Sequence, residues 1–152
     1  MPAFFTFGRV LFAVLFIVSG ASKLLDLAAT AQMTEKIMLP AALAVYTSQY
    51  TSQLEGLTGM PMPQMLAIAA GGLELICGLM IALNFGARFF AILLIMFVAA
   101  ATFYFHDFWN QTGADARGNM IHALKNLSII GALFMIAGYG RPAQVPAAAY
   151  DV

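Results

Sequence analysis

Four long apolar stretches, separated by more polar segments, dominate the hydrophobic pattern of the chain. They cover residues 4–25, 65–83, 87–105 and 119–137. Each is close to the roughly 20 residues that an α-helix needs to cross the hydrocarbon core of a bilayer. The pattern therefore predicts an all-α integral membrane protein, a four-helix bundle that forms a single transmembrane domain over residues 1–152.

The only long connection, residues 26–64, lies between the first two stretches. Its apolar content is too interrupted for a span, but residues 30–38 and 41–53 could form short helices at the membrane interface. A connection of this length without structure would be unusual. We therefore expect a folded extramembrane loop that covers one end of the bundle.

The first stretch has a second interpretation. A cation at Arg9, an apolar run and the small residues Ser19, Gly20 and Ala21 also describe a secretory signal peptide. The sequence retains this segment from its first residue, and we expect an uncleaved helix. Arg9, Gly20 and Lys23 share one helical face, with the two cations roughly 21 Å apart along the axis.

Composition supports the membrane assignment. The 152 residues are 62% hydrophobic and only 9% charged, whereas soluble domains carry about 25% charged residues. A lipid-facing surface needs no charges, and a formal net charge of zero gives no reason to expect a nucleic-acid partner. The one cysteine, Cys77, excludes an internal disulfide, a CxxC redox pair and a CxxCH haem attachment.

The orientation signal is small. Four spans place both termini on one side, and the basic residues divide between the two sides. The terminal side carries Arg9, Arg88 and Arg141, and the other side carries Lys23, Lys36, Arg117 and Lys125. Because Lys23 and Lys125 fall within helix ends, we discount them and expect cytoplasmic termini.

Glu74 lies near the middle of the second span, where a charged side chain costs at least about 2.5–3.5 kcal/mol. It must be protonated, paired or in contact with water, and Arg9, Lys23 and Lys125 are candidate partners. Gly71 shares its helical face and permits close approach of another helix. A proton or ligand site and a buried ion pair that fixes helix register are both consistent with this position.

A second polar group is expected at the membrane face opposite the termini. Span parity places the end of the first helix, the end of the third and the start of the fourth there. The residues expected in one pocket are Lys23, His106, His122, Lys125 and Asn126, with Asp107 and Trp109 at its rim. Asp107 could hold a histidine or lysine in place, and His106 could titrate near neutral pH.

Three interpretations compete for this pocket. A quinone headgroup needs partners for its two carbonyls beside aromatic walls and an opening to lipid, and these residue types are present. Haem b could use His106 and His122, but two histidines near a turn support it weakly, because haem needs a deep pocket. In the third interpretation, these residues anchor the helix ends at the membrane interface and cap the hairpin. The sequence has no further His, Asp or Glu residues at the spacing of metal ligands, so it gives no indication of a metal site.

The polar motifs, taken in order, resemble the DoxX family of small bacterial membrane proteins. They are GRVLFAVLFIVSGASKL, Glu74 followed by Gly78, HDFW and IHALKNLSIIGALF. The resemblance implies a four-helix inner-membrane protein, and related DoxD-type proteins are part of a thiosulfate:quinone oxidoreductase. The family's polar positions correspond here to Arg9, Gly20, Lys23, Glu74, His106, Lys125 and Asn126.

From residues and resemblance together we expect a multi-pass protein of the bacterial plasma membrane. The expected role is a non-catalytic subunit of a membrane redox or respiratory complex, with other subunits as partners and quinone as the candidate ligand. An oxidoreductase subunit of the thiosulfate:quinone type, a structural or assembly protein, and a small transporter with Glu74 as proton relay are the alternatives. Catalysis, if any, would belong to the complex.

Overall fold

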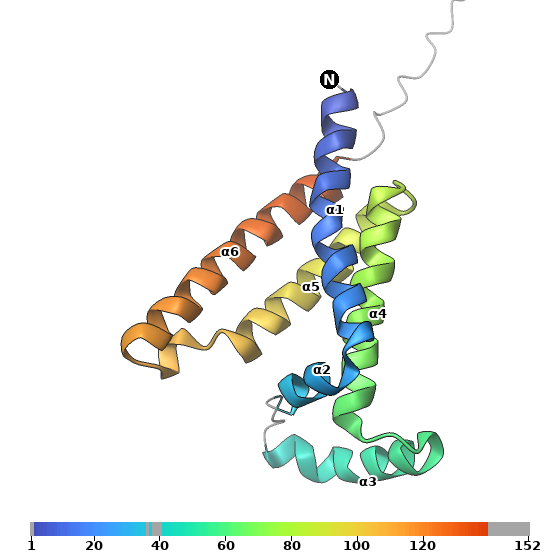
Figure 1. Cartoon of the computed structure of the whole chain (residues 1–152), viewed down its shortest axis with the longest axis vertical. Coiled ribbons are helices and arrows are strands. Elements are labelled where there is room, and N and C mark those ends of the chain that lie inside the picture. The colour runs from blue at the N-terminus through green and yellow to red at the C-terminus, as the bar shows by residue number, and fades with distance from the viewer. Residues whose placement is uncertain (1, 36, 38–40, 140–152) are drawn as a thin grey trace, which may run out of the picture.

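Four long helices form the frame of the protein in a computed structural model that describes residues 2–35, 37 and 41–139 (Figure 1). They are α1 (Pro2–Leu25), α4 (Met62–Ala82), α5 (Ala87–Phe105) and α6 (Gly113–Gly138). Each is long and apolar enough to cross a membrane. No strand occurs among the described residues. The predicted all-α membrane bundle is confirmed.

The last long helix begins earlier than the apolar pattern indicated. Residues 119–137 were expected, whereas α6 starts at Gly113. The two additional turns are polar, so hydropathy could not mark them. Asp115 lies in the first turn of α6, where a carboxylate interacts favourably with the positive end of the helix dipole. The helix therefore projects beyond its apolar part at the end that follows the α5–α6 turn.

The long connection folds into two further helices, α2 (Leu27–Thr34) and α3 (Ala41–Thr58). Asp26 caps α2 by accepting a hydrogen bond from Ala29 N at 3.1 Å, so this helix begins before the predicted residue 30. Thr34 Oγ1 donates to the Pro63 carbonyl at 2.7 Å and fixes α2 against the start of α4. Figure 1 shows α3 lying across one end of the α1–α4 pair.

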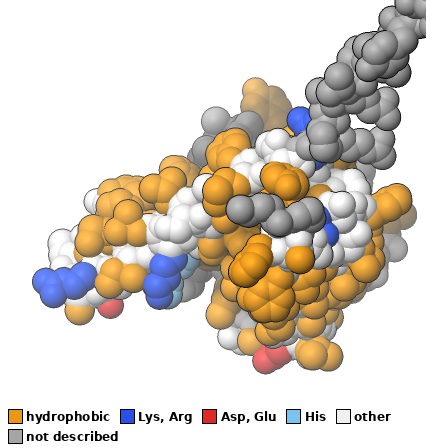
Figure 2. Space-filling view, turned by 90° about the horizontal axis from the view of Figure 1, so that it is seen from above, with side chains coloured by type: hydrophobic (Ala, Val, Ile, Leu, Met, Phe, Trp, Pro, Cys, Tyr) orange, Lys and Arg blue, Asp and Glu red, His pale blue; other side chains and the backbone are white. Residues whose placement is uncertain are grey.

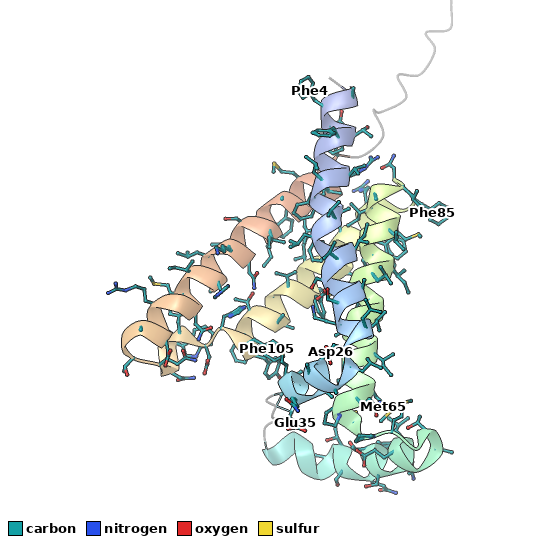
Figure 3. The ribbon with its side chains drawn as sticks, viewed as in Figure 1. Phe4, Asp26, Glu35, Met65, Phe85 and Phe105 are labelled. Carbon is teal, nitrogen blue, oxygen red and sulfur yellow. The ribbon has the colours of Figure 1, made fainter. Side chains whose placement is uncertain are left out.

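Some sequence expectations fall outside the described residues. They concern the end of the predicted helix at Met38 and two basic residues used for orientation, Lys36 and Arg141. Within the described residues, Figure 3 places Phe4 and Phe85 toward one end of the molecule and Asp26 and Phe105 toward the other. The α1–α2 and α5–α6 connections therefore lie at the end opposite the N-terminus.

Glycines allow α1 and α4 to approach closely. A Cβ atom added at Gly20 would lie 2.5 Å from Leu75 N and 2.6 Å from Gly71 O, both backbone atoms of α4. A Cβ at Gly78 would lie 3.0 Å from Ile17 N. Small residues at such contacts let membrane helices pack backbone to backbone. The α1–α4 pair is therefore the most tightly packed part of the protein.

All four long helices contribute to one core near the end that carries the N-terminus. Its buried residues are Ala13, Phe16, Cys77, Ile81, Ala91, Leu94, Val98, Leu133 and Ile136. From this core the α5–α6 hairpin and the α1–α4 pair diverge, as both views show (Figures 1 and 2). The polar ends of the two pairs are therefore held apart, and each must be described separately.

Candidate functional site

The first polar group of the membrane-spanning region is an ion pair between α1 and α4. Lys23 Nζ lies 2.9 Å from Glu74 Oε2 and donates a second hydrogen bond to Ser19 Oγ at 2.6 Å. The Glu74 side chain is 6% exposed and that of Lys23 is 30% exposed. The carboxylate that was expected to need a basic partner from another helix has one.

This ion pair continues the glycine contact between the two helices. Gly20 and Lys23 are three residues apart on α1, as Gly71 and Glu74 are on α4, and such spacing places side chains on one helical face. The Thr30 hydroxyl donates to the Lys23 carbonyl at 3.2 Å, so α2 covers this end of the pair. The ion pair is therefore partly buried between two closely packed helices.

The second polar group lies at the α5–α6 turn, and we call it the hairpin cluster. It is a chain of hydrogen bonds with His122 stacked against one end, and its residues are His106, Asp107, Gln111, Asn119 and His122. The short helix η1 (Phe108–Asn110) forms the turn. Gln111 Nε2 donates to Asp107 Oδ1 at 2.7 Å. Asn119 Nδ2 donates to Gln111 Oε1 at 2.6 Å, and Asn119 Oδ1 lies 3.1 Å from His106 Nδ1.

The direction of these hydrogen bonds determines which ring nitrogen of His106 carries the proton. Because the Asn119 amide donates through nitrogen to Gln111, its oxygen remains as the acceptor that faces His106. The assigned orientation requires a proton on His106 Nδ1, which leaves Nε2 as the acceptor of a neutral ring. Among the described residues, that Nε2 has no hydrogen-bond partner.

The second histidine lies against the first. The rings of His106 and His122 stack with centroids 5.1 Å apart and an interplanar angle of 14°. His122 is exposed, so the stacked pair presents imidazole to the outside of the hairpin. One turn further along α6, Asn126 Nδ2 donates to Thr102 Oγ1 of α5 at 2.9 Å.

A groove follows the line where α5 and α6 meet. Its volume is about 380 Å³, and its lining residues are Ala99, Thr102, Phe108, Met120, Ala123, Leu124, Leu127 and Ile130. Apart from the Thr102 hydroxyl, every lining side chain is apolar. The groove therefore combines an apolar surface, one aromatic wall at Phe108 and a hydroxyl that already binds Asn126.

The structure brings only some of the predicted pocket residues together. His106 and His122 are in contact, and Asn126 lies on the same hairpin. Lys23 contacts Ser19 and Glu74 on the other helix pair. The single pocket expected from span parity is therefore divided between two diverging helix pairs.

Three further residues differ from expectation. Asp107 binds the amides of Gln111 and Asn110 instead of a histidine or lysine. Lys125 is exposed and forms no ion pair with any described residue. Arg9 also lacks an acidic partner among the described residues, and its buried Nε has no hydrogen-bond partner. Trp109 contacts Phe103 and Phe108 beside the turn.

Sequence reasoning missed three members of the polar network: Thr102, Gln111 and Asn119. Asn119, His122 and Asn126 share one face of α6, because they are three and four residues apart. Likewise, Thr102 precedes His106 by four residues on the face of α5 that meets α6. Helical spacing from the two histidines would therefore have found Thr102 and Asn119, but no periodic signal marks Gln111 in the turn.

No group of three His, Cys, Asp or Glu side chains that could hold a metal ion occurs within residues 2–35, 37 and 41–139. Cys77 is buried in the core between the helices, with an exposed fraction of 2%. It lies three residues after Glu74 on α4 and belongs to the apolar core.

Comparison with known proteins identifies relatives of this architecture. The family model described as DoxX matches residues 4–57 and 46–107, so α6 lies outside the matched segments. The chain is similar to the inner membrane protein YphA of Escherichia coli (strain K12), with 36% identity over 91 residues. That alignment covers 60% of this chain and 62% of YphA, so the chain spans less than two thirds of this relative. No solved structure matches.

Proposed function

The chain belongs to the DoxX family of multi-pass inner-membrane proteins, and we propose that it is a non-catalytic subunit of a membrane redox complex that binds a quinone at the α5–α6 hairpin. The observation that carries this proposal is the free Nε2 of His106 at the end of a directed hydrogen-bond chain. An α6 face with His122 and Asn126 adds further polar groups to the same hairpin.

The hairpin cluster suits the reduced form of a quinone. A neutral His106 with its proton on Nδ1 can accept a hydrogen bond from a quinol hydroxyl through Nε2. Asn119, Gln111 and Asp107 hold the ring in this tautomer through their aligned hydrogen bonds. In the protonated state, Nε2–H can instead donate to a quinone carbonyl.

The neighbouring groove suits the rest of such a ligand. Ligand sites are typically apolar surfaces with a few placed polar groups. Apart from the Thr102 hydroxyl, the groove between α5 and α6 is apolar from Phe108 to Ile130, and a prenyl tail would take this direction from the interface into lipid. The electrons would come from and go to other subunits, because the proposed role of this chain is to hold the quinone.

Direct quinone binding tests this proposal. The full-length protein, in phospholipid nanodiscs, is titrated with a short-chain quinone and its quinol, and quenching of the single tryptophan, Trp109, is followed. His106→Ala should weaken binding about two- to tenfold, since one hydrogen bond between neutral groups contributes roughly 0.5–1.5 kcal/mol. Met135→Ala is the matched control, because Met135 is exposed on α6 near its other end.

Two results would contradict the proposal. Equal and weak partitioning of the quinone into wild type and His106→Ala would leave interfacial capping as the role of the cluster. An equal loss in His106→Ala and Met135→Ala would show a general effect on the helix. Tighter binding of the quinol than of the quinone is the result expected from a free acceptor at Nε2.

We also propose that both termini face the cytoplasm, which rests on an even number of spans and the small arginine bias. A reporter that is active only in the periplasm, fused after Val152 or inserted at Gln53 in α3, tests the orientation. Activity is expected at Gln53, and periplasmic activity at Val152 would reverse the topology.

A further inference from the structure

One side of α3 carries aromatic and apolar side chains that remain exposed. Tyr46, Tyr50, Leu54 and Leu57 follow one another at spacings of four, four and three residues, so they share one side of the helix. Their exposed fractions run from 46% at Leu54 to 85% at Leu57. We call this surface the α3 stripe.

The apolar pattern of the sequence could not define this surface. It indicated that residues 41–53 could form a short helix at the membrane interface, whereas α3 continues to Thr58. Leu54 and Leu57 lie beyond the predicted end. The structure therefore completes the stripe and shows which side of the helix it occupies.

Contacts with the start of α4 fix the orientation of α3. Glu55 Oε1 accepts a hydrogen bond from Met62 N at 2.7 Å, and its carboxylate lies at the positive end of the α4 dipole. Thr51 and Thr47 precede Glu55 by four and eight residues on the same side of the helix, and all three are partly buried. The side of α3 that faces the protein is therefore polar, and the stripe lies beside it.

The connection to α4 fixes the depth of α3 in the membrane. Helix α4 is long and apolar enough to cross a bilayer, so its first residue, Met62, lies near the edge of the hydrocarbon core. Only residues 59–61 separate Met62 from the end of α3 at Thr58, and a link of this length spans at most roughly 10–14 Å. Because the headgroup layer is roughly 5–8 Å thick on each side, α3 lies in or next to it (Figure 1).

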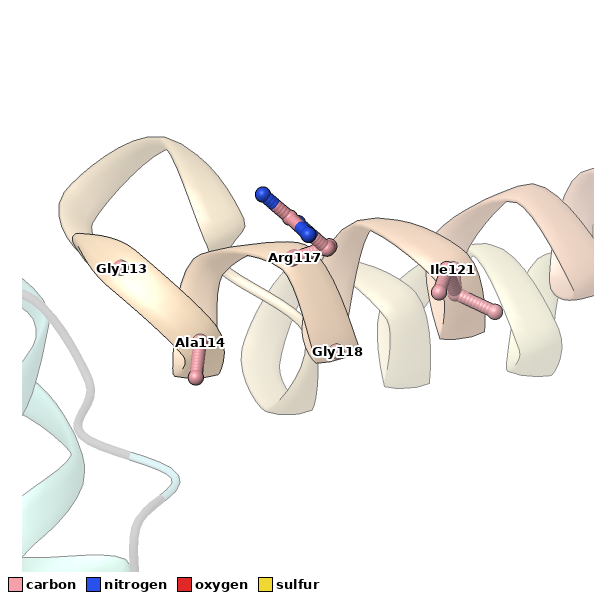
Figure 4. Close-up of a pocket in the computed structure, with 5 residues that line it drawn as sticks. All are labelled: Gly113, Ala114, Arg117, Gly118 and Ile121. Carbon is pink, nitrogen blue, oxygen red and sulfur yellow. The ribbon is translucent and has the colours of Figure 1, made fainter.

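The α5–α6 connection at the same end of the molecule differs from α3 in charge. Asp115 and Arg117 are exposed at the start of α6. Figure 4 shows Arg117 beside a shallow hollow of about 510 Å³. By contrast, the one charged residue of α3 is Glu55, which is held against the start of α4. The exposed surface of α3 therefore offers no charge to water or to an anionic headgroup.

We propose that the α3 stripe inserts into the lipid interface on the side of the membrane where α1 ends and α4 begins. Tyrosine suits this layer because its ring is apolar and its hydroxyl can reach water, and the leucines lie toward the acyl chains. A lipid surface is favoured over a protein partner because the bilayer already surrounds the two spans that flank α3. Insertion holds the α1–α4 pair at one depth.

Site-directed spin labelling tests this proposal in the full-length protein in phosphatidylcholine nanodiscs. Nitroxides are attached to Tyr50→Cys or Leu57→Cys on the stripe, and to Gln49→Cys or Ser52→Cys on the exposed polar side. Collisions with oxygen, which dissolves in lipid, are compared with collisions with a water-soluble nickel chelate. The oxygen-to-nickel ratio should be several-fold higher at both stripe positions. Unsubstituted protein measures background labelling of the buried Cys77.

A matched pair of variants links the ratio to the stripe itself. In the labelled Tyr50→Cys protein, Leu57→Gln removes an apolar side chain from the stripe and should lower the ratio at the label. Ser52→Gln changes the polar side and should leave the ratio unchanged. Both side chains are exposed, so neither change disturbs the core. Added phosphatidylglycerol should have no effect, because α3 carries no cation.

Three results would overturn the proposal. Equal ratios at all four labelled positions, with frequent nickel collisions, would place the stripe in water. Few collisions with either reagent at Tyr50 and Leu57 would mean that protein covers the stripe, either a second copy of this chain or another subunit. Insertion only in the presence of phosphatidylglycerol would mean that charge attraction, and not the stripe, holds α3 at the membrane.

Discussion

The two helix pairs of this protein are built in opposite ways. In the α1–α4 pair Gly20, Gly71 and Gly78 face the partner helix, and Gly20 lies so close to α4 that a Cβ would meet backbone atoms at 2.5 Å and 2.6 Å. In the α5–α6 hairpin the glycines of α6 face outward, and a Cβ at Gly118 or Gly131 would meet nothing within 4 Å. The first pair is joined by backbone contact and the second by side chains.

The polar groups of the two helix pairs also differ, because one set is paired internally and the other is not. Glu74 is buried and its charge is matched by Lys23. In the hairpin, by contrast, His106 retains a free ring nitrogen, and His122 and Lys125 are exposed. A satisfied pair stabilises one arrangement of helices, whereas polar groups without a partner remain available to a ligand. On the quinone proposal above, α1–α4 would be the scaffold and α5–α6 the binding element.

The largest expected effect follows from removing half of the ion pair. Glu74→Ala leaves the Lys23 ammonium without its partner inside the helix pair. The free energy of unfolding should fall by about 3 kcal/mol, the lower end of the 3–5 kcal/mol range for broken buried pairs, because Lys23 is 30% exposed. Unfolding in mixed detergent micelles measures this loss.

The double variant Lys23→Met, Glu74→Leu provides the control. It removes both charges together, and replacement of a whole buried pair by apolar residues is often neutral or stabilising. If Glu74→Ala and the double variant lost the same stability, the charge pair would not be the cause. If Glu74→Ala had no effect, the ion pair would not hold α1 and α4 together.

A matched pair of glycine substitutions tests whether a glycine of α1 faces its partner helix and a glycine of α6 faces outward. Gly20→Ala places a methyl group against the backbone of α4 and should cost about 1–3 kcal/mol by overpacking. Gly131→Ala meets open space and should leave stability unchanged or raise it by up to about 1 kcal/mol. Reaction of Cys77 with a maleimide should accelerate in the first variant only, since this thiol is buried among the helices.

The smallest expected effect concerns the hairpin. Asn126→Ala removes the hydrogen bond to Thr102, and such bonds between membrane helices contribute about 0.6 kcal/mol on average. The unfolding free energy should therefore change little, while quinone affinity should fall measurably. A stability loss as large as that of Glu74→Ala would mean that the hairpin is a scaffold of the same kind as α1–α4.

Much of the fold could be predicted from the apolar pattern, because a bilayer admits few alternatives to spanning helices. The inward position of Gly71 could also be predicted, because helical spacing places it on the face of Glu74. A basic partner of Glu74 could be predicted because a lone charge inside the membrane is costly. The polar first turns of α6 could not be predicted this way, because hydropathy marks only the part of a helix that lies in lipid.

The candidate site was harder to predict. Span parity places Lys23, His106 and Lys125 at the same end of the molecule, but it says nothing about the angle between helix pairs. The core joins the pairs at the other end, so their polar ends diverge and Lys23 is separated from the hairpin. Tertiary packing decides this angle, and no local pattern in the sequence records it.

Photoaffinity labelling tests the central claim, that the hairpin binds quinone and the α1–α4 pair is the scaffold. An azidoquinone is reacted with the full-length protein in native membranes, and labelled peptides are identified by mass spectrometry. The label is expected on α5 or α6 between Ala99 and Ile130, the limits of the groove. Excess unlabelled quinone should displace it. Displaceable label confined to α1 and α4 beside Lys23 and Glu74, or label that excess quinone does not displace, would contradict the claim.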